Sequence, residues 1–95
     1  MKLRHAAALA LVVWLLMNPP TRGAPAYILY HAPLSRWDVS EWYDTKAECL
    51  DRLKDITDNT KRDLDACTHG ECAVNVARGA AGRCIASDDP RLKRK

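Results

Sequence analysis

Four cysteines constrain this chain of 95 residues more than any other feature of its sequence. They are Cys49, Cys67, Cys72 and Cys84, an even number on the scale of one small domain. A domain of this size buries too little apolar surface to offset its chain entropy without crosslinks, and even cysteine counts in small exported domains are typical of disulfide frameworks. We therefore expect a disulfide-stapled fold with all four cysteines bridged.

The segment from Thr45 to Cys67 has the periodicity of one long amphipathic helix. Thr45 followed by Glu48 matches a capping box at its start, and Gly70 is suited to end it. One face collects the residues at helical spacing, namely Cys49, Leu53, Ile56, Thr60, Leu64 and Cys67. We expect a helix over 45–67 that packs this face on a small core.

Three other segments favour strands, at Tyr27–Tyr30, Arg36–Tyr43 and Arg83–Ala86. The second strand should contain a bulge or end early after Val39, because apolar residues no longer alternate between its two faces there. Between Glu71 and Arg83 the glycines argue against a long helix, so a short helical turn and then a loop are expected. The predicted fold class is small α+β, with the long helix on a short antiparallel sheet.

Four of the aromatic residues in these strands are considered together, namely Tyr30, Trp37, Trp42 and Tyr43. We expect them to pack at the core and its rim. An aromatic platform for a ligand is the alternative, and it requires that they be exposed together.

The four cysteines allow three pairings. Cys49 and Cys67 lie 18 residues apart, about 27 Å along an unbroken helix, which is too far for a disulfide. The favoured scheme joins Cys49 to Cys84 and Cys67 to Cys72, because the strand that leads into the helix and the last strand, at Cys84, can lie side by side at the start of the helix. The alternative joins Cys49 to Cys72 and Cys67 to Cys84.

The first 26 residues have the layout of a secretory signal peptide. A basic start precedes the apolar run Ala6–Met17, and Ala24–Ala26 offers small residues at the positions that a signal peptidase reads. An uncleaved membrane anchor is the alternative, although twelve apolar residues span only about 18 Å as a helix. We expect a signal peptide over 1–26, one domain over 27–90, a basic flexible tail over 91–95, and export to the periplasm or the cell exterior.

Charge argues against nucleic acid as a partner. The whole chain has a formal charge of +3, but residues 27–95 contain 12 basic and 12 acidic side chains. Four of the positive charges lie in residues 91–95. The remaining partner classes are a protein and an anionic envelope surface.

Zinc is an alternative use of the same cysteines. Cys67, His69, Cys72 and Cys84 supply three thiolates and an imidazole, but the spacing lacks the paired C-x2-C motifs of structural zinc sites. No catalytic constellation is legible, and His69 and His31 have no partner suggested by spacing. We expect no enzymatic activity, no bound metal and no cofactor.

Several segments resemble a group of small, exported, uncharacterised bacterial proteins. They are Met17–Pro20 (MNPP), Ala32–Trp37 (APLSRW), Tyr43–Thr45 leading to Glu48–Cys49, and Cys84–Lys93 (CIASDDPRLK). The resemblance implies export, a cysteine early in the helix and another before the Asp-Asp-Pro turn, with no established activity. In the proteins it resembles, the segment ending in Pro-Pro follows the signal peptide, whereas here it abuts the apolar run. This departure leaves two alternatives, another cleavage site or another start methionine.

These observations predict a non-catalytic binding or structural domain. The alternatives are a zinc-binding module and a membrane-anchored envelope protein.

Overall fold

The computed structural model describes residues 12–93. The predicted α+β class is confirmed: an antiparallel sheet combines with helices and two disulfides. The strands of the described chain are β1 (Trp14–Asn18), β2 (Thr21–Arg22), β3 (Tyr27–Ile28), β4 (Asp38–Tyr43) and β5 (Arg83–Ala86). Of these, β2 and β3 pair only with each other. The helices are α2 (Lys46–Asp58), α3 (Thr60–Asp65) and α4 (Gly70–Ala80), with 3-10 turns η1 (Leu34–Arg36) and η2 (Pro90–Lys93).

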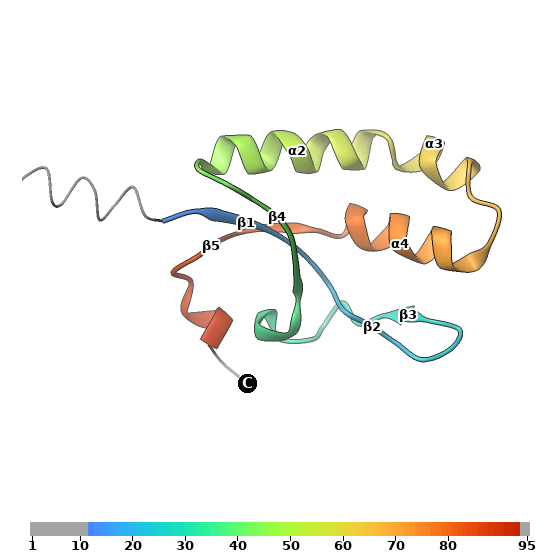
Figure 1. Cartoon of the computed structure of the whole chain (residues 1–95), viewed down its shortest axis with the longest axis horizontal. Coiled ribbons are helices and arrows are strands. Elements are labelled where there is room, and N and C mark those ends of the chain that lie inside the picture. Colours follow the sequence, from blue (N-terminus) through green and yellow to red (C-terminus); the bar gives the residue numbers. More distant parts are fainter. Residues whose placement is uncertain (1–11, 94–95) are drawn as a thin grey trace, which may run out of the picture.

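β1 is the central strand of a three-stranded sheet with the order β4-β1-β5 (Figure 1). Leu16 pairs with Glu41 on one side and with Cys84 on the other. Leu16 and Met17 are 0% and 3% exposed, so both faces of this strand are covered. A strand covered on both faces has a continuous apolar sequence, which cannot be told from a signal-peptide core by periodicity alone.

The folded unit therefore extends upstream of the boundary predicted after Ala26. Trp14–Asn18 supplies the middle of the sheet, and Ala24–Ala26 lies in the turn that joins β2 to β3. A chain that started at Tyr27 would lack β1 and leave β4 and β5 without a common neighbour. The rest of the predicted signal segment, 1–11, lies outside the described residues, as do 94–95 of the predicted tail.

The two faces of the sheet are covered by different elements (Figure 1). On one face α2 contacts β1, β4 and β5, and Leu16 and Cys49 are fully buried there. On the other face η1 and η2 contact each other over a core of Met17, Leu34, Trp37 and Ile85. Among residues 12–93, none of the helices is both long and apolar enough to cross a bilayer.

β4 contains the predicted bulge. The β1–β4 register shifts between Leu16 and Met17, which pair with Glu41 and Val39 and leave Ser40 without a partner position. The Ser40 hydroxyl donates to the Leu16 carbonyl at 3.1 Å. Because of the extra residue, Val39 and Trp42 both fall on the face that carries Met17 and Leu15.

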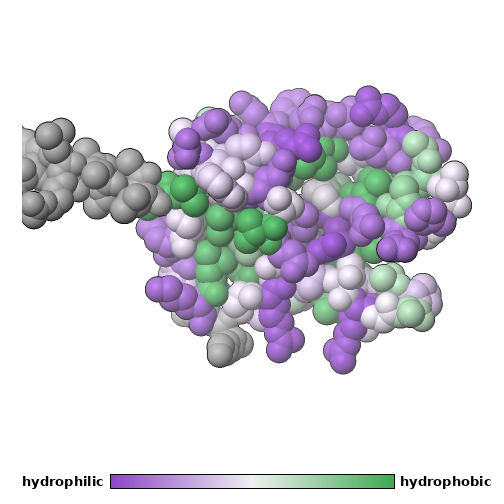
Figure 2. Space-filling view, in the orientation of Figure 1, coloured by the Kyte–Doolittle hydropathy of each residue, from purple (hydrophilic) through white to green (hydrophobic). Residues whose placement is uncertain are grey.

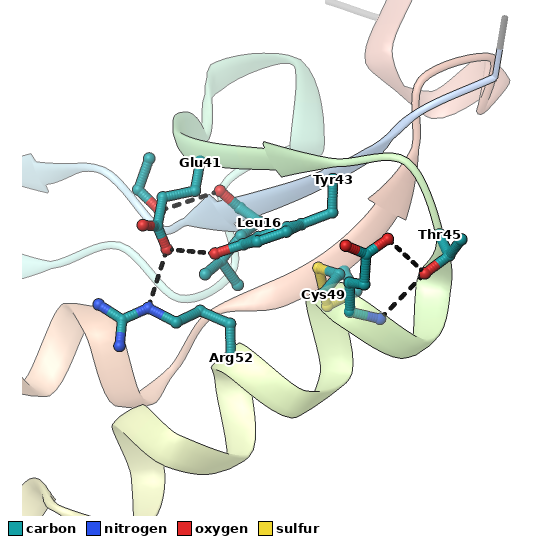
Figure 3. The surroundings of a disulfide bond; sticks show 9 residues. Leu16, Glu41, Tyr43, Thr45, Cys49 and Arg52 are labelled. Carbon is teal, nitrogen blue, oxygen red and sulfur yellow. Dashed lines mark hydrogen bonds and ion pairs between the residues drawn. A yellow bond between two sulfur atoms is a disulfide. The ribbon is translucent and has the colours of Figure 1, made fainter.

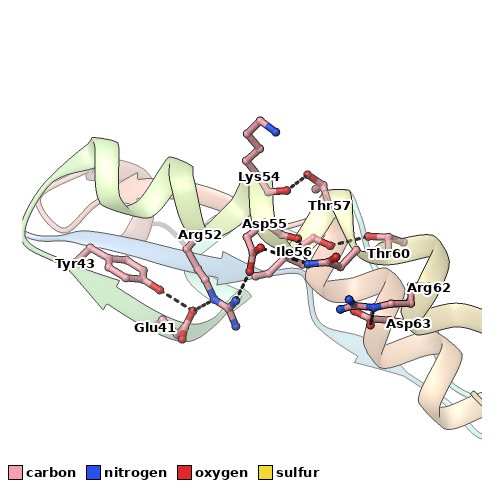
Figure 4. Close-up of polar contacts among 11 residues, drawn as sticks. Glu41, Tyr43, Arg52, Lys54, Asp55, Ile56, Thr57, Thr60, Arg62 and Asp63 are labelled. Carbon is pink, nitrogen blue, oxygen red and sulfur yellow. Dashed lines mark hydrogen bonds and ion pairs between the residues drawn. The ribbon is translucent and has the colours of Figure 1, made fainter. Parts of the chain in front are cut away.

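The predicted single helix over 45–67 is broken at Asn59 into α2 and α3. Thr45 caps its start as predicted, accepting from the Glu48 amide at 3.2 Å. At the break, Asn59 Nδ2 donates to the Asp55 carbonyl at 2.9 Å and Thr60 Oγ1 donates to the Ile56 carbonyl at 3.0 Å (Figure 4). Side chains that bond backbone groups in this way compete with the helical ladder, which explains the break.

The loop expected after Glu71 was a wrong prediction, because Gly70–Ala80 forms the helix α4. His69 provides its cap, with Nδ1 accepting from the Cys72 amide at 3.2 Å. The glycines do not prevent this helix. Gly79 lies against α2, where a Cβ would be 3.5 Å from Ile56 Cγ2. Gly82 lies beyond the helix end, where a Cβ would be 3.0 Å from Asn18 Oδ1.

Candidate functional site

The structure contains both disulfides of the favoured pairing. Cys49 in the first turn of α2 is joined to Cys84 in β5, with Cα atoms 6.0 Å apart (Figure 3). Cys67, after α3, is joined to Cys72 in the first turn of α4, with Cα atoms 5.5 Å apart. The first disulfide joins the helix layer to the sheet, and the second fixes the sharp connection between two helices.

The alternative zinc set is not brought together. Cys84 is bonded to Cys49, and Cys67 is bonded to Cys72, so none of the three predicted thiolates is free to bind a metal. His69 uses Nδ1 to cap α4. Within residues 12–93, no three His, Cys, Asp or Glu side chains group as a metal site.

A polar cluster joins β4 to α2. The Tyr43 hydroxyl donates to Glu41 Oε1 at 2.8 Å, and Arg52 Nε donates to the same oxygen at 3.0 Å (Figure 4). The hydrogen bond from Tyr43, together with Arg52, lowers the pKa of Glu41, whereas burial and the Glu41 carboxylate raise the pKa of Tyr43. At neutral pH Glu41 is therefore ionised and Tyr43 protonated, and the cluster holds β4 and α2 together.

Arg78 makes a second polar link, from α4 to the sheet. Its Nε donates to the Pro19 carbonyl at 2.8 Å, and its Nη2 donates to Asp38 Oδ2 at 2.6 Å. Only 21% of its side chain is exposed. Like the first cluster, this contact positions elements and leaves no polar group aimed into an open site.

An open apolar groove lies between the β2–β3 hairpin and the α3–α4 pair. Its volume is about 520 Å³. Tyr27 and Tyr30 are about half exposed at one side, and Leu64 of α3 is 39% exposed at the other. Its remaining lining is small and apolar and comes from Ile28, Ala73, Val74 and Ala77. Because Cys67–Cys72 fixes α3 against α4, the helical wall of the groove is covalently held.

The four aromatic residues considered as a platform are separated in the structure. Trp37 is 7% exposed and belongs to the core. Tyr43 pairs with Trp14 on the α2 face of the sheet, whereas Trp42 pairs with Leu15 on the opposite face. Of the four, only Tyr30 lines the groove. Sequence reasoning missed Tyr27 and Leu64 as its neighbours, and Leu64 could have been found only from the helix break that turns α3.

Comparison with known protein families, with curated proteins and with solved structures finds no match to this chain.

Proposed function

We propose that this protein is a small exported, non-catalytic binding domain, and that it binds a protein partner through the groove of Tyr27, Tyr30 and Leu64. The observation that carries the proposal is the exposure of these three large side chains around one apolar groove. Tyrosines combine a large apolar area with a hydroxyl, and they are enriched at protein interfaces.

The covalent framework supports a binding role. The helical wall is fixed by Cys67–Cys72, and the helix layer is joined to the sheet by Cys49–Cys84. A groove whose walls are already fixed loses less conformational entropy when it is occupied. The polar clusters at Glu41 and Arg78 join structural elements, which fits a scaffold better than a catalyst.

Two disulfides are consistent with an oxidising compartment. Export is the corresponding proposal, with the periplasm or the cell exterior as the location. We infer that the chain is not cleaved after Ala26, because β1 is the central strand of the sheet. The resemblance to small exported bacterial proteins supports the same compartment.

The test is capture from the native envelope fraction with matched variants of the full chain. Leu64→Ser and Tyr30→Ser should each remove a protein that the wild type captures. Leu50→Ser is the control, because Leu50 is 46% exposed on α2 and lies outside the groove. Equal capture by all four chains would refute the groove as the binding surface.

A further inference from the structure

A second apolar surface lies on the sheet face turned away from α2. Val39 and Trp42 are 50% and 65% exposed, and the bulge at Ser40 brings both onto this face. Leu15 is opposite Trp42 in the ladder and packs against the core. The exposed side chains of Val39 and Trp42 are therefore next to the apolar core on this face of the sheet.

Coverage of this face is incomplete. The 3-10 turns η1 and η2 lie over Met17, Trp37 and Ile85, which are 3–7% exposed. They leave Val39 and Trp42 of β4 uncovered. In Figure 2 apolar surface is visible over the sheet, below the polar row formed by α2 and α3.

Basic side chains surround the same face. Arg36 of η1 and Lys93 of η2 line one shallow depression, and the Arg83 guanidinium lies 5.2 Å from the centre of the Trp37 ring. None of the three has an ion-pair partner among residues 12–93 (the pairs there join other side chains). The sequence continues from Lys93 with two further basic residues, Arg94 and Lys95.

Most acidic side chains near this face are paired: on β4, Asp38 pairs with Arg78 and Glu41 pairs with Arg52. Asp89 is paired with Arg91 at 2.8 Å, which leaves Asp88 as the other acid of the segment. On α2 and α3, in contrast, basic side chains pair with acids of the same helix, as in Lys54 with Asp58 and Lys61 with Asp65. Three basic side chains without an ion-pair partner thus lie on the side of the sheet that carries Trp42, whereas the other unpaired basic residues of 12–93, Arg22 and Lys46, belong to β2 and α2.

We propose that this face binds the surface of an anionic lipid bilayer. Tryptophan is favoured at the membrane interface, where its ring is half solvated. Lysine and arginine near an anionic surface are attracted to it, and the attraction is screened by salt.

The β4 edge is a poor template for a protein strand. The bulge at Ser40 interrupts its ladder. A lipid surface needs no ladder, and it fits both the exposed Trp42 and the basic rim. The membrane proposal uses none of the residues that line the groove of Tyr27, Tyr30 and Leu64. Either this proposal or the proposed binding of a protein in the groove can therefore fail alone.

The experiment is sedimentation of the full chain with vesicles of phosphatidylcholine, alone or mixed with phosphatidylglycerol. Wild type should bind the mixed vesicles, and binding should weaken as salt rises. Arg36→Ser and Lys93→Ser should each weaken it about fivefold, and together about 25-fold. The matched control is Lys61→Ser on α3, whose side chain is 89% exposed and paired with Asp65; this variant should bind as wild type does.

Trp42→Phe provides an independent readout, because it keeps an aromatic ring at the site. Brominated lipid should quench tryptophan fluorescence in the wild type and should quench little in this variant, since Trp37 is buried and Trp14 is covered by Lys46. Circular dichroism checks that each variant is folded. Equal affinity for both vesicle types would overturn the proposal. So would vesicle binding that Arg36→Ser and Lys93→Ser leave unchanged, together with quenching that Trp42→Phe leaves unchanged.

Discussion

Cys49 and Cys84 are bonded beside Leu16, which is the residue opposite Cys84 in the β1–β5 ladder. Cys49 and Leu16 are both 0% exposed. The first turn of α2 is thereby joined to one edge of the sheet, and the central strand is enclosed beneath the bond. The stability of this domain should depend on this contact more than on any surface ion pair.

Removal of Cys49–Cys84 should lower the stability of the domain more than removal of Cys67–Cys72. Cys49→Ala with Cys84→Ala opens a link across 35 residues, and Cys67→Ala with Cys72→Ala opens one across 5. Chain entropy predicts losses of about 4 and about 2 kcal/mol in the free energy of unfolding. Urea denaturation of the two double variants measures the difference, and equal losses would contradict the assignment of Cys49–Cys84 as the main crosslink.

Thiol reductants should open the two disulfides in a fixed order. Both residues of Cys67–Cys72 are half-buried, whereas Cys49–Cys84 joins a fully buried residue, Cys49, to a half-buried one, Cys84. Exchange requires that a thiolate reach a sulfur atom, so Cys67–Cys72 should open first. Alkylation of the native protein during mild reduction, followed by peptide mapping, gives the order. Simultaneous labelling of all four cysteines would show that the protein unfolds before either bond is reached.

The central strand can be tested with one truncation of a side chain. Leu16→Ala should destabilise the domain by about 2 to 5 kcal/mol, because it opens a cavity in a fully buried site. Leu50→Ala is the control for a leucine that is 46% exposed, and its effect should stay within about 0.5 kcal/mol. Thermal unfolding measures both; a silent Leu16→Ala would mean that β1 is not part of the core.

The Glu41 cluster gives a pH dependence of defined sign. Hydrogen bonds from Tyr43 and Arg52 lower the pKa of Glu41 below its ordinary value of 4.5. The folded chain thus releases this proton more readily than the unfolded chain, so the cluster stabilises the fold above the unfolded pKa. This contribution is lost as pH falls through the folded pKa. Glu41→Gln should lower the melting temperature slightly at pH 7, because the site is partly exposed and the pair is solvated.

The difference between Glu41→Gln and wild type should then shrink as the pH is lowered from about 4.5 towards 2. Asp89, whose pKa Arg91 lowers to about 2, titrates in both proteins and cancels in the comparison. A difference that stays constant over this pH range would mean that the carboxylate charge of Glu41 does not contribute.

Local signals in the sequence were sufficient for several elements. The Thr45 cap, the strand Arg83–Ala86 and the bulge beyond Val39 each depend on a few neighbouring residues, and all are present. The pairing of Cys49 with Cys84 followed from the expectation that the start of the helix lies near the last strand.

The remaining features depend on contacts distant in sequence. Trp14–Asn18 has the apolarity of a leader, and its role as a strand follows only from β4 and β5 on its two sides. The helix break depends on which carbonyls Asn59 and Thr60 reach, and the helix Gly70–Ala80 is packed against α2 and α3. The groove needs α3 turned at that break, so no single segment of the sequence could indicate it.

The intact mass of the native protein shows whether it is an exported, disulfide-crosslinked domain that includes β1. Protein purified from the envelope fraction or the medium should have a mass that includes Trp14–Asn18 and is lower by four hydrogen atoms than the reduced chain, as two disulfides require. A mature chain that starts near Tyr27, or one that retains free thiols, would contradict the account.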